Sequence, residues 1–101
     1  MEGIPRRFRA LEHRSLFGFE VPVATTRRSR LLGLALLPRE RAGSGLLLPR
    51  CRSVHTYGMR FPLDVLFLDK EDRVIEIRRD QPAGRILRCA EASSVLEVPS
   101  P

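Results

Sequence analysis

A short apolar run at residues 63–69 constrains the fold of this chain more than any other stretch. Its sequence is Leu-Asp-Val-Leu-Phe-Leu-Asp, so apolar side chains occupy both odd and even positions. A strand with one buried face alternates apolar and polar residues, whereas a run of this kind indicates a strand buried on nearly both faces. A polar turn at 70–72 and the segment 73–78 follow, and we predict that they complete an antiparallel hairpin.

A second strand is predicted at residues 15–24. Its apolar residues Phe17, Phe19, Val21 and Val23 share one period-2 face, which is typical of a half-buried strand. Pro22 has no backbone N–H, so this strand lies at a sheet edge or carries a bulge there. Shorter strands are expected at 45–48, 85–90 and 95–98.

One helix is predicted to follow Thr25 or Thr26, either of which can serve as its N-cap. It runs for about three turns, with Leu31, Leu34 and Leu37 as an apolar stripe, until Pro38 ends it. Gly33 would cost about 1 kcal/mol relative to Ala inside this helix. A glycine there indicates close approach to another element.

Helix and strands do not alternate along the chain, which argues against a doubly wound parallel sheet. We therefore predict a mainly β (α+β) fold, a small jelly-roll-like β-sandwich or half-open barrel with one short helix packed against it. A chain of 101 residues forms a single domain, 1–101. Residues 1–14 are expected to be a partly disordered, Arg-rich lead, with residues 1–6 frayed.

Composition narrows the class of protein. Hydrophobic residues make up 43% and charged residues 30%, as in an ordered globular protein. No apolar run approaches the roughly 20 residues of a membrane helix. The N-terminus lacks the apolar segment of a secretory signal, and two cysteines are few for a secreted protein of this size. We therefore expect a cytoplasmic protein with reduced thiols.

The net charge of +6 is unevenly distributed. Residues 1–60 hold twelve arginines against four glutamates, whereas residues 61–101 have a net charge of −2. A basic half invites a nucleic-acid hypothesis. The arginines occur in pairs over several predicted elements, and codon usage explains an excess of Arg over Lys as well as phosphate binding does. Nucleic-acid binding is therefore a third hypothesis and is not favoured.

Chemically versatile residues concentrate between Cys51 and Asp69. Cys51, His55 and Asp64 have the residue types of a nucleophile, a base and an orienting acid. The alternative is a buried thiol packed as a small hydrophobe and a histidine bonded to backbone. Metal ligation is weakly indicated because the candidate ligands Cys51, Cys89, His13 and His55 are scattered without a paired motif. We predict no metal and no cofactor.

Asp64 is the most unusual of these residues because it interrupts an apolar strand. A buried carboxylate needs an ion pair or hydrogen bonds. Arg60, His55 or the backbone N–H groups of 57–59 could supply them, and Asp64 would then lock the loop before its own strand. A ligand contact is the alternative. The candidate binding residues of this block are His55, Tyr57, Met59, Arg60 and Asp64.

Four segments together resemble a known family. They are Arg30-Leu-Leu-Gly33-Leu34, Gly45-Leu-Leu-Leu, the block from Cys51 to Asp69 that contains His55-Thr-x-Gly58-Met59-x-Phe61-Pro-Leu-Asp64, and Val95-Leu-Glu-Val98. Their order and spacing over about residues 20–98 resemble domain of unknown function 192, found in small bacterial and archaeal proteins. The resemblance implies a mainly β, jelly-roll-like fold with a short helix, and no assigned biochemical role.

One departure from the family pattern concerns the C-terminus. Members usually continue beyond the Val-Leu-Glu strand with a glycine-containing segment and a further strand, whereas here Pro99-Ser100-Pro101 follow. The departure raises the question of whether the last strand leaves an open sheet edge, which would promote self-pairing.

A small non-enzymatic binding or accessory domain is the function we expect, with its patch around residues 55–64. Positive charge for an anionic ligand would come from Arg27, Arg28, Arg30, Arg50, Arg52 and Arg60. The partner would be an unknown protein or a small anionic ligand, without nucleic acid or membrane, and the chain a monomer or weak dimer. The alternative is a Cys/His-dependent hydrolase or transferase that uses Cys51 and His55.

Overall fold

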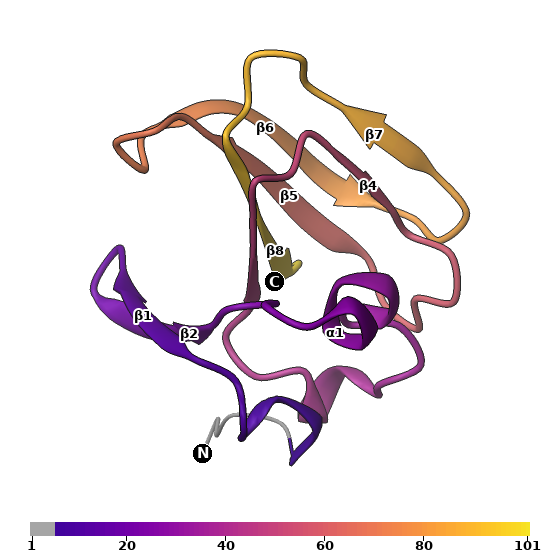
Figure 1. Cartoon of the computed structure of the whole chain (residues 1–101). Helices are drawn as coiled ribbons and strands as arrows, with labels where there is room; N and C mark the ends of the chain where they lie inside the picture. Colours follow the sequence, from indigo (N-terminus) through magenta and orange to yellow (C-terminus); the bar gives the residue numbers. More distant parts are fainter. Residues whose placement is uncertain (1–5) are drawn as a thin grey trace.

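A four-stranded antiparallel sheet is the largest sheet of the protein (Figure 1). The structure, a computed structural model, describes residues 6–101. The strand order of this sheet is β3 (Leu46–Pro49), β8 (Ser94–Pro99), β5 (Leu63–Leu68) and β6 (Val74–Gln81). The predicted hairpin is confirmed as β5–β6. Five of the six β5 residues are buried, and the sixth is half-buried, as expected for a strand covered on both faces.

The last strand of the chain lies inside this sheet. Strand β8 pairs with β3 on one side and with β5 on the other, both antiparallel. The C-terminal strand therefore leaves no open edge, since β3 and β6 occupy the two ends of the sheet. Ser100, just after β8, donates its backbone N–H to the Pro62 carbonyl at 3.0 Å.

The predicted strand at 15–24 is wrong, because a hairpin occupies this segment. Strands β1 (His13–Leu16) and β2 (Phe19–Pro22) pair across a two-residue turn. Phe17 has a φ of 53° and Gly18 a φ of 86°, and positive φ at both central residues matches the twist of a tight hairpin. The reversal leaves Phe17 and Phe19 exposed at the tip, while Val21 is fully buried.

A third pair of strands, β4 (Ser53–His55) and β7 (Ile86–Arg88), completes the β structure. Val54 and Leu87 of this pair pack into one core cluster with Val65 and Phe67 of the sheet. The β1–β2 hairpin packs on the opposite face, in a second cluster with Leu47, Leu68 and Leu96. The mainly β fold is thus confirmed, and the three sheets formed by the described strands do not close into a barrel.

Helix α1 (Arg27–Leu32) is half as long as predicted. Thr26 is its N-cap, with a capping box in which the Thr26 and Ser29 side chains bond reciprocally to backbone N–H groups. Gly33 ends the helix with a φ of 51°. The predicted leucine stripe fails for this reason, since Leu31 is 68% exposed and the buried Leu34 lies beyond the helix.

The close approach predicted at Gly33 is present. A β-carbon at this position would lie 3.2 Å from Oε1 of Glu97, so α1 ends directly against strand β8. The guanidinium of Arg7 donates to the carbonyls of Gly33, at 3.2 Å, and Ala35, at 2.9 Å. These bonds satisfy carbonyl groups at the end of the helix.

The N-terminal lead has a structured portion. A 3-10 turn, η1 (Arg6–Phe8), begins the described chain, and the Phe8 side chain is fully buried in the first core cluster. Residues 1–5, most of the segment expected to be frayed, lie outside the described residues. A second 3-10 turn, η2 (Arg39–Arg41), follows Pro38. No helix within 6–101 combines the length and apolar character needed to cross a membrane.

Candidate functional site

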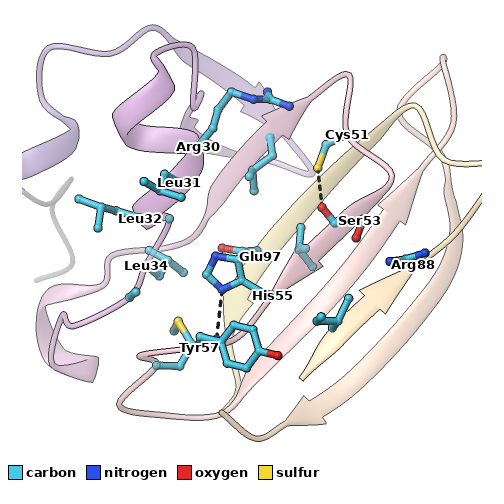
Figure 2. Close-up of a pocket in the computed structure, with 16 residues that line it drawn as sticks. Arg30, Leu31, Leu32, Leu34, Cys51, Ser53, His55, Tyr57, Arg88 and Glu97 are labelled. Carbon is cyan, nitrogen blue, oxygen red and sulfur yellow. Dashed lines mark hydrogen bonds between the residues drawn. The ribbon is translucent and has the colours of Figure 1, made fainter. Parts of the chain in front are cut away.

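A cavity of about 380 Å³ opens between the end of α1 and strand β4 (Figure 2). Residues 30–35 form one wall, and residues of the 51–59 segment with Ile86 and Arg88 form the other. Leu48 of β3 and Glu97 of β8 come from the central sheet and form the base. Most of the lining is apolar, so the few polar groups among it can determine which ligand the cavity accepts.

One backbone edge of strand β4 lies at this cavity and pairs with no other described strand. The residues on either side of β4 bond to β7, since the Arg52 carbonyl accepts from Cys89 and the Thr56 N–H donates to Arg85, both at 2.9 Å. Hydrogen-bonding direction alternates along an antiparallel strand, so the backbone groups of Ser53 and His55 point to the other edge. The thiol of Cys51, a cavity residue, donates to the Ser53 carbonyl at 3.2 Å on this edge.

His55 and Tyr57 lie together at one end of the cavity, as Figure 2 shows. Their rings stack with centroids 5.3 Å apart and an angle of 26° between the planes. Nδ1 of His55 accepts a hydrogen bond from the Tyr57 backbone N–H at 3.2 Å. In the neutral imidazole the other nitrogen, Nε2, therefore carries the proton and is a donor. The predicted binding residue Met59 also lines the cavity.

Cys51 and His55 do not form a nucleophile–base pair. The Cys51 thiol bonds to the Ser53 carbonyl, and the one His55 nitrogen that accepts a hydrogen bond is used by Tyr57. Figure 2 shows the two side chains at different ends of the cavity. A thiol–imidazole mechanism requires these groups within hydrogen-bond reach, and each of them bonds to another partner here.

Asp64 lies outside the cavity, and its predicted partners are wrong. Its Oδ1 accepts hydrogen bonds from the Asp80 backbone N–H and the Ser100 hydroxyl, both at 2.8 Å. Its Oδ2 lies 3.6 Å from Arg79 Nη1. The register between β5 and β6 shifts at this point, and Asp80 has a φ of 55°. Asp64 therefore holds a bulge in β6 and the C-terminal segment together, instead of the loop before its own strand.

The candidates Arg60 and Cys89 likewise do not line the cavity, whereas Cys51 does. Arg60 is exposed and is absent from the cavity lining. Both cysteines are free thiols, and burial raises the pKa of the Cys89 thiol. Within residues 6–101, no three His, Cys, Asp or Glu side chains converge in a way that could hold a metal ion.

Glu97 is the cavity residue that sequence reasoning missed. Its side chain is 4% exposed and sits between Leu46 of β3 and Val65 of β5. Burial raises the pKa of this carboxyl to about 8, so it is mostly protonated at neutral pH. No described residue donates a hydrogen bond to this carboxyl, and no buried side-chain oxygen among the described residues lacks a partner, so its oxygens are accessible from the cavity. The carboxyl faces the cavity, close to the end of α1.

A signal for Glu97 exists in the sequence. It interrupts the apolar segment Val95-Leu96-Glu97-Val98, as Asp64 interrupts the segment at 63–69. The same argument that singled out Asp64 applies to Glu97. Sequence position alone does not tell which of the two carboxyls has hydrogen-bond partners in the folded protein, because the partners depend on which strands become neighbours.

Comparisons with known proteins agree on the fold. The family model DUF192, described as "Uncharacterized ACR", matches residues 10–100. A crystal structure described as a "putative transcription regulator" from Sinorhizobium meliloti 1021 has a TM-score of 0.70 at 22% identity, over 81% of this chain and 69% of that one.

A second crystal structure, of a protein of unknown function from Novosphingobium aromaticivorans DSM 12444, has a TM-score of 0.63 at 18% identity. It covers 97% of this chain and 88% of the other. At these identities the likeness concerns the fold alone. A search of curated proteins found no match.

Proposed function

The chain belongs to the domain of unknown function 192 family, and we propose that it is a small non-enzymatic binding domain whose cavity takes an organic ligand. The carrying observation is Glu97, a buried carboxyl without a hydrogen-bond partner among the described residues. A carboxyl that lines a cavity and has no hydrogen-bond partner among the described residues can bond directly to a ligand, because when protonated it both donates and accepts.

The cavity has the size and the lining of a small-molecule site. Its volume of about 380 Å³ lies in the range of roughly 300–1,000 Å³ that such sites occupy. Three kinds of polar group offer orientation. They are the Glu97 carboxyl, which both donates and accepts when protonated, the Nε2–H of His55, and the backbone edge of β4 at Ser53 and His55 that faces away from β7. The ligand would place its apolar body among the leucines and a hydrogen-bonding group against Glu97.

A cytoplasmic location is part of the proposal. It is supported by Cys51 and Cys89, which are both free thiols, since exported proteins commonly pair their cysteines. The hydrolase or transferase alternative has less support, because Cys51 and His55 bond to other partners.

The neutral fluorophore N-phenyl-1-naphthylamine tests the proposal, because its emission rises when it leaves water for an apolar cavity. We expect saturable binding, with amide shifts in a ¹H–¹⁵N spectrum confined to cavity residues such as Gly33, Ser53 and His55. Ser53→Phe should abolish binding, because this exposed side chain stands at the cavity wall and a phenyl ring there would fill the space.

Ser15→Phe is the matched control, since Ser15 is also an exposed strand serine but lies in β1, away from the cavity. It should bind the probe as the unmodified protein does. Absence of saturable binding, or equal loss in the two variants, would contradict a ligand site in this cavity.

A further inference from the structure

A second hollow, of about 710 Å³, adjoins the cavity and has a different chemical character. The two share Arg30, Cys51 and Ser53 in their linings, so they lie side by side at these residues. Four cationic side chains, Arg30, Arg50, Arg52 and Lys70, line the second hollow, and no acidic side chain lines it. We call this hollow the basic basin.

No ion pair within residues 6–101 involves a cation of the basic basin. The ion pairs among the described residues involve Arg14, Arg73, Arg78 and Arg79. Uncompensated cations at the edge of an apolar cavity raise the local concentration of anions. The cavity, by contrast, has a mostly apolar lining, and its Glu97 carboxyl is mostly protonated at neutral pH.

Arg30 stands where the two hollows meet, and its position is fixed. Its guanidinium donates to the Pro49 carbonyl at 2.6 Å and to the Arg50 carbonyl at 3.3 Å. A guanidinium has five N–H donors, so these two bonds leave donors available. A side chain held in place in this way loses little conformational entropy when an anion binds.

From the adjacency of the two hollows and their contrasting linings, we propose that the ligand is an amphiphilic organic anion. Its apolar body occupies the cavity, and its carboxylate, sulfonate or phosphate group lies in the basic basin against Arg30, Arg50 and Arg52. This inference rests on the proposed function and specifies the ligand class for the same site. Protonated Glu97 places no negative charge near the bound anion.

A pair of probes that differ only in one sulfonate tests the inference. N-phenyl-1-naphthylamine is neutral, and 8-anilinonaphthalene-1-sulfonate has the same ring system with the anion added. We expect the sulfonate to bind at least about tenfold more tightly than the neutral probe, because charge-assisted hydrogen bonds are stronger than neutral ones. Added salt should lower the affinity for the sulfonate and leave the affinity for the neutral probe nearly unchanged.

Matched double variants separate the basin from general attraction to a basic protein. In Arg50→Gln/Arg52→Gln, the ratio of the affinity for the sulfonate to the affinity for the neutral probe should fall to near one. Arg27→Gln/Arg28→Gln removes the same charge from exposed residues that line neither hollow, and should leave this ratio unchanged. Competition with octanoate and phenyl phosphate then distinguishes a carboxylate from a phosphate ligand.

Three results would overturn this inference. They are equal affinity for the two probes, equal weakening by the two double variants, and displacement of the sulfonate by inorganic phosphate alone. The last would mean a simple anion site that needs no apolar body. If the neutral probe still binds and Ser53→Phe still blocks it, the proposed function stands and only the anionic preference is lost. If neither probe binds, both proposals fail.

Discussion

Asp64 and Glu97 lie one register position apart on neighbouring strands and point to opposite faces of the same sheet. Asp64 of β5 is paired with Val98 of β8, and Glu97 of β8 is paired with Val65 of β5. Since side chains alternate across a strand, the two carboxyls are on opposite faces. Asp64 faces the bulge of β6 and Ser100, where three groups contact it, whereas Glu97 faces the cavity.

The two carboxyls therefore have different roles. Asp64 connects β6 to the C-terminal segment and is structural. Glu97 lacks a partner among the described residues and is the group that a ligand would satisfy. Two similar anomalies in the sequence thus correspond to one structural carboxyl and one carboxyl that we propose binds a ligand, and the following predictions test the two separately.

Glu97→Gln should flatten the pH dependence of stability. Burial raises the pKa of folded Glu97 from the ordinary 4.5 to about 8, so between these values the folded state holds a proton that the unfolded state has released. The contribution of this group is fully present below the unfolded pKa and is lost as pH rises to the folded pKa. The free energy of unfolding should fall by up to about 1.4 kcal/mol per pH unit in this window.

Urea denaturation between about pH 5 and pH 8 measures this slope. The titratable and charged groups around the cavity, Arg30, Cys51, His55, Tyr57 and Arg88, are common to both proteins, so the difference between the two slopes isolates Glu97. Glu91→Gln, at an exposed position, should leave the slope unchanged. Parallel curves for the unmodified protein and Glu97→Gln would contradict a protonated Glu97.

Gly33→Ala should destabilise the protein more than Gly18→Ala. Both glycines have positive φ, so each substitution introduces backbone strain of about 1 kcal/mol. A β-carbon at Gly18 would meet nothing within 4 Å, whereas one at Gly33 would lie 3.2 Å from Glu97 Oε1. Chemical denaturation of both variants gives the excess at Gly33, and equal losses would show that α1 yields readily at this contact.

Asp64→Ala should cost about 2–4 kcal/mol, because it leaves the Asp80 N–H and the Ser100 hydroxyl without their acceptor. Asp64→Asn, which retains an oxygen acceptor, should destabilise less, by about 1 kcal/mol. A double-mutant cycle with Ser100→Ala measures the Asp64–Ser100 coupling. Strict additivity in this cycle, or an unchanged melting temperature for Asp64→Asn, would argue against the structural role.

Thr26→Ala should lower stability by about 1 kcal/mol, since the Thr26 hydroxyl accepts from the Ser29 N–H at 3.0 Å. Thr25→Ala is the control, because Thr25 is exposed and the cap belongs to Thr26. Thermal denaturation followed by circular dichroism compares the two. A larger loss in Thr25→Ala would mean that α1 begins one residue earlier.

Local pattern was sufficient for much of the secondary structure. The apolar run at 63–69 predicted β5 and its hairpin partner, because a strand buried on both faces has apolar residues at odd and even positions alike. Thr26 as one of two possible caps, and Gly33 as a point of close approach, also followed from local chemistry. The single strand at 15–24 failed because Phe17 adopts a positive φ that its residue type does not favour.

The candidate site was predicted only in part. His55, Tyr57 and Met59 were predicted as binding candidates and do line the cavity, while Arg60 and Asp64 do not. Glu97 was missed although it carries the same anomaly as Asp64. Glu97 is far from residues 30–35 and 51–59 in the sequence and joins them only through the pairing of β8 between β3 and β5.

By itself the sequence determined a mainly β chain, the hairpin at its centre and the existence of buried carboxyls, because each depends on a residue and its near neighbours. Only the tertiary structure decided which carboxyl is satisfied and which one faces a cavity. Strand register sets the face on which a side chain lies, and long-range pairing sets what that face meets. Neither quantity is a property of a local segment, so Asp64 became part of the scaffold and Glu97 the base of the candidate site.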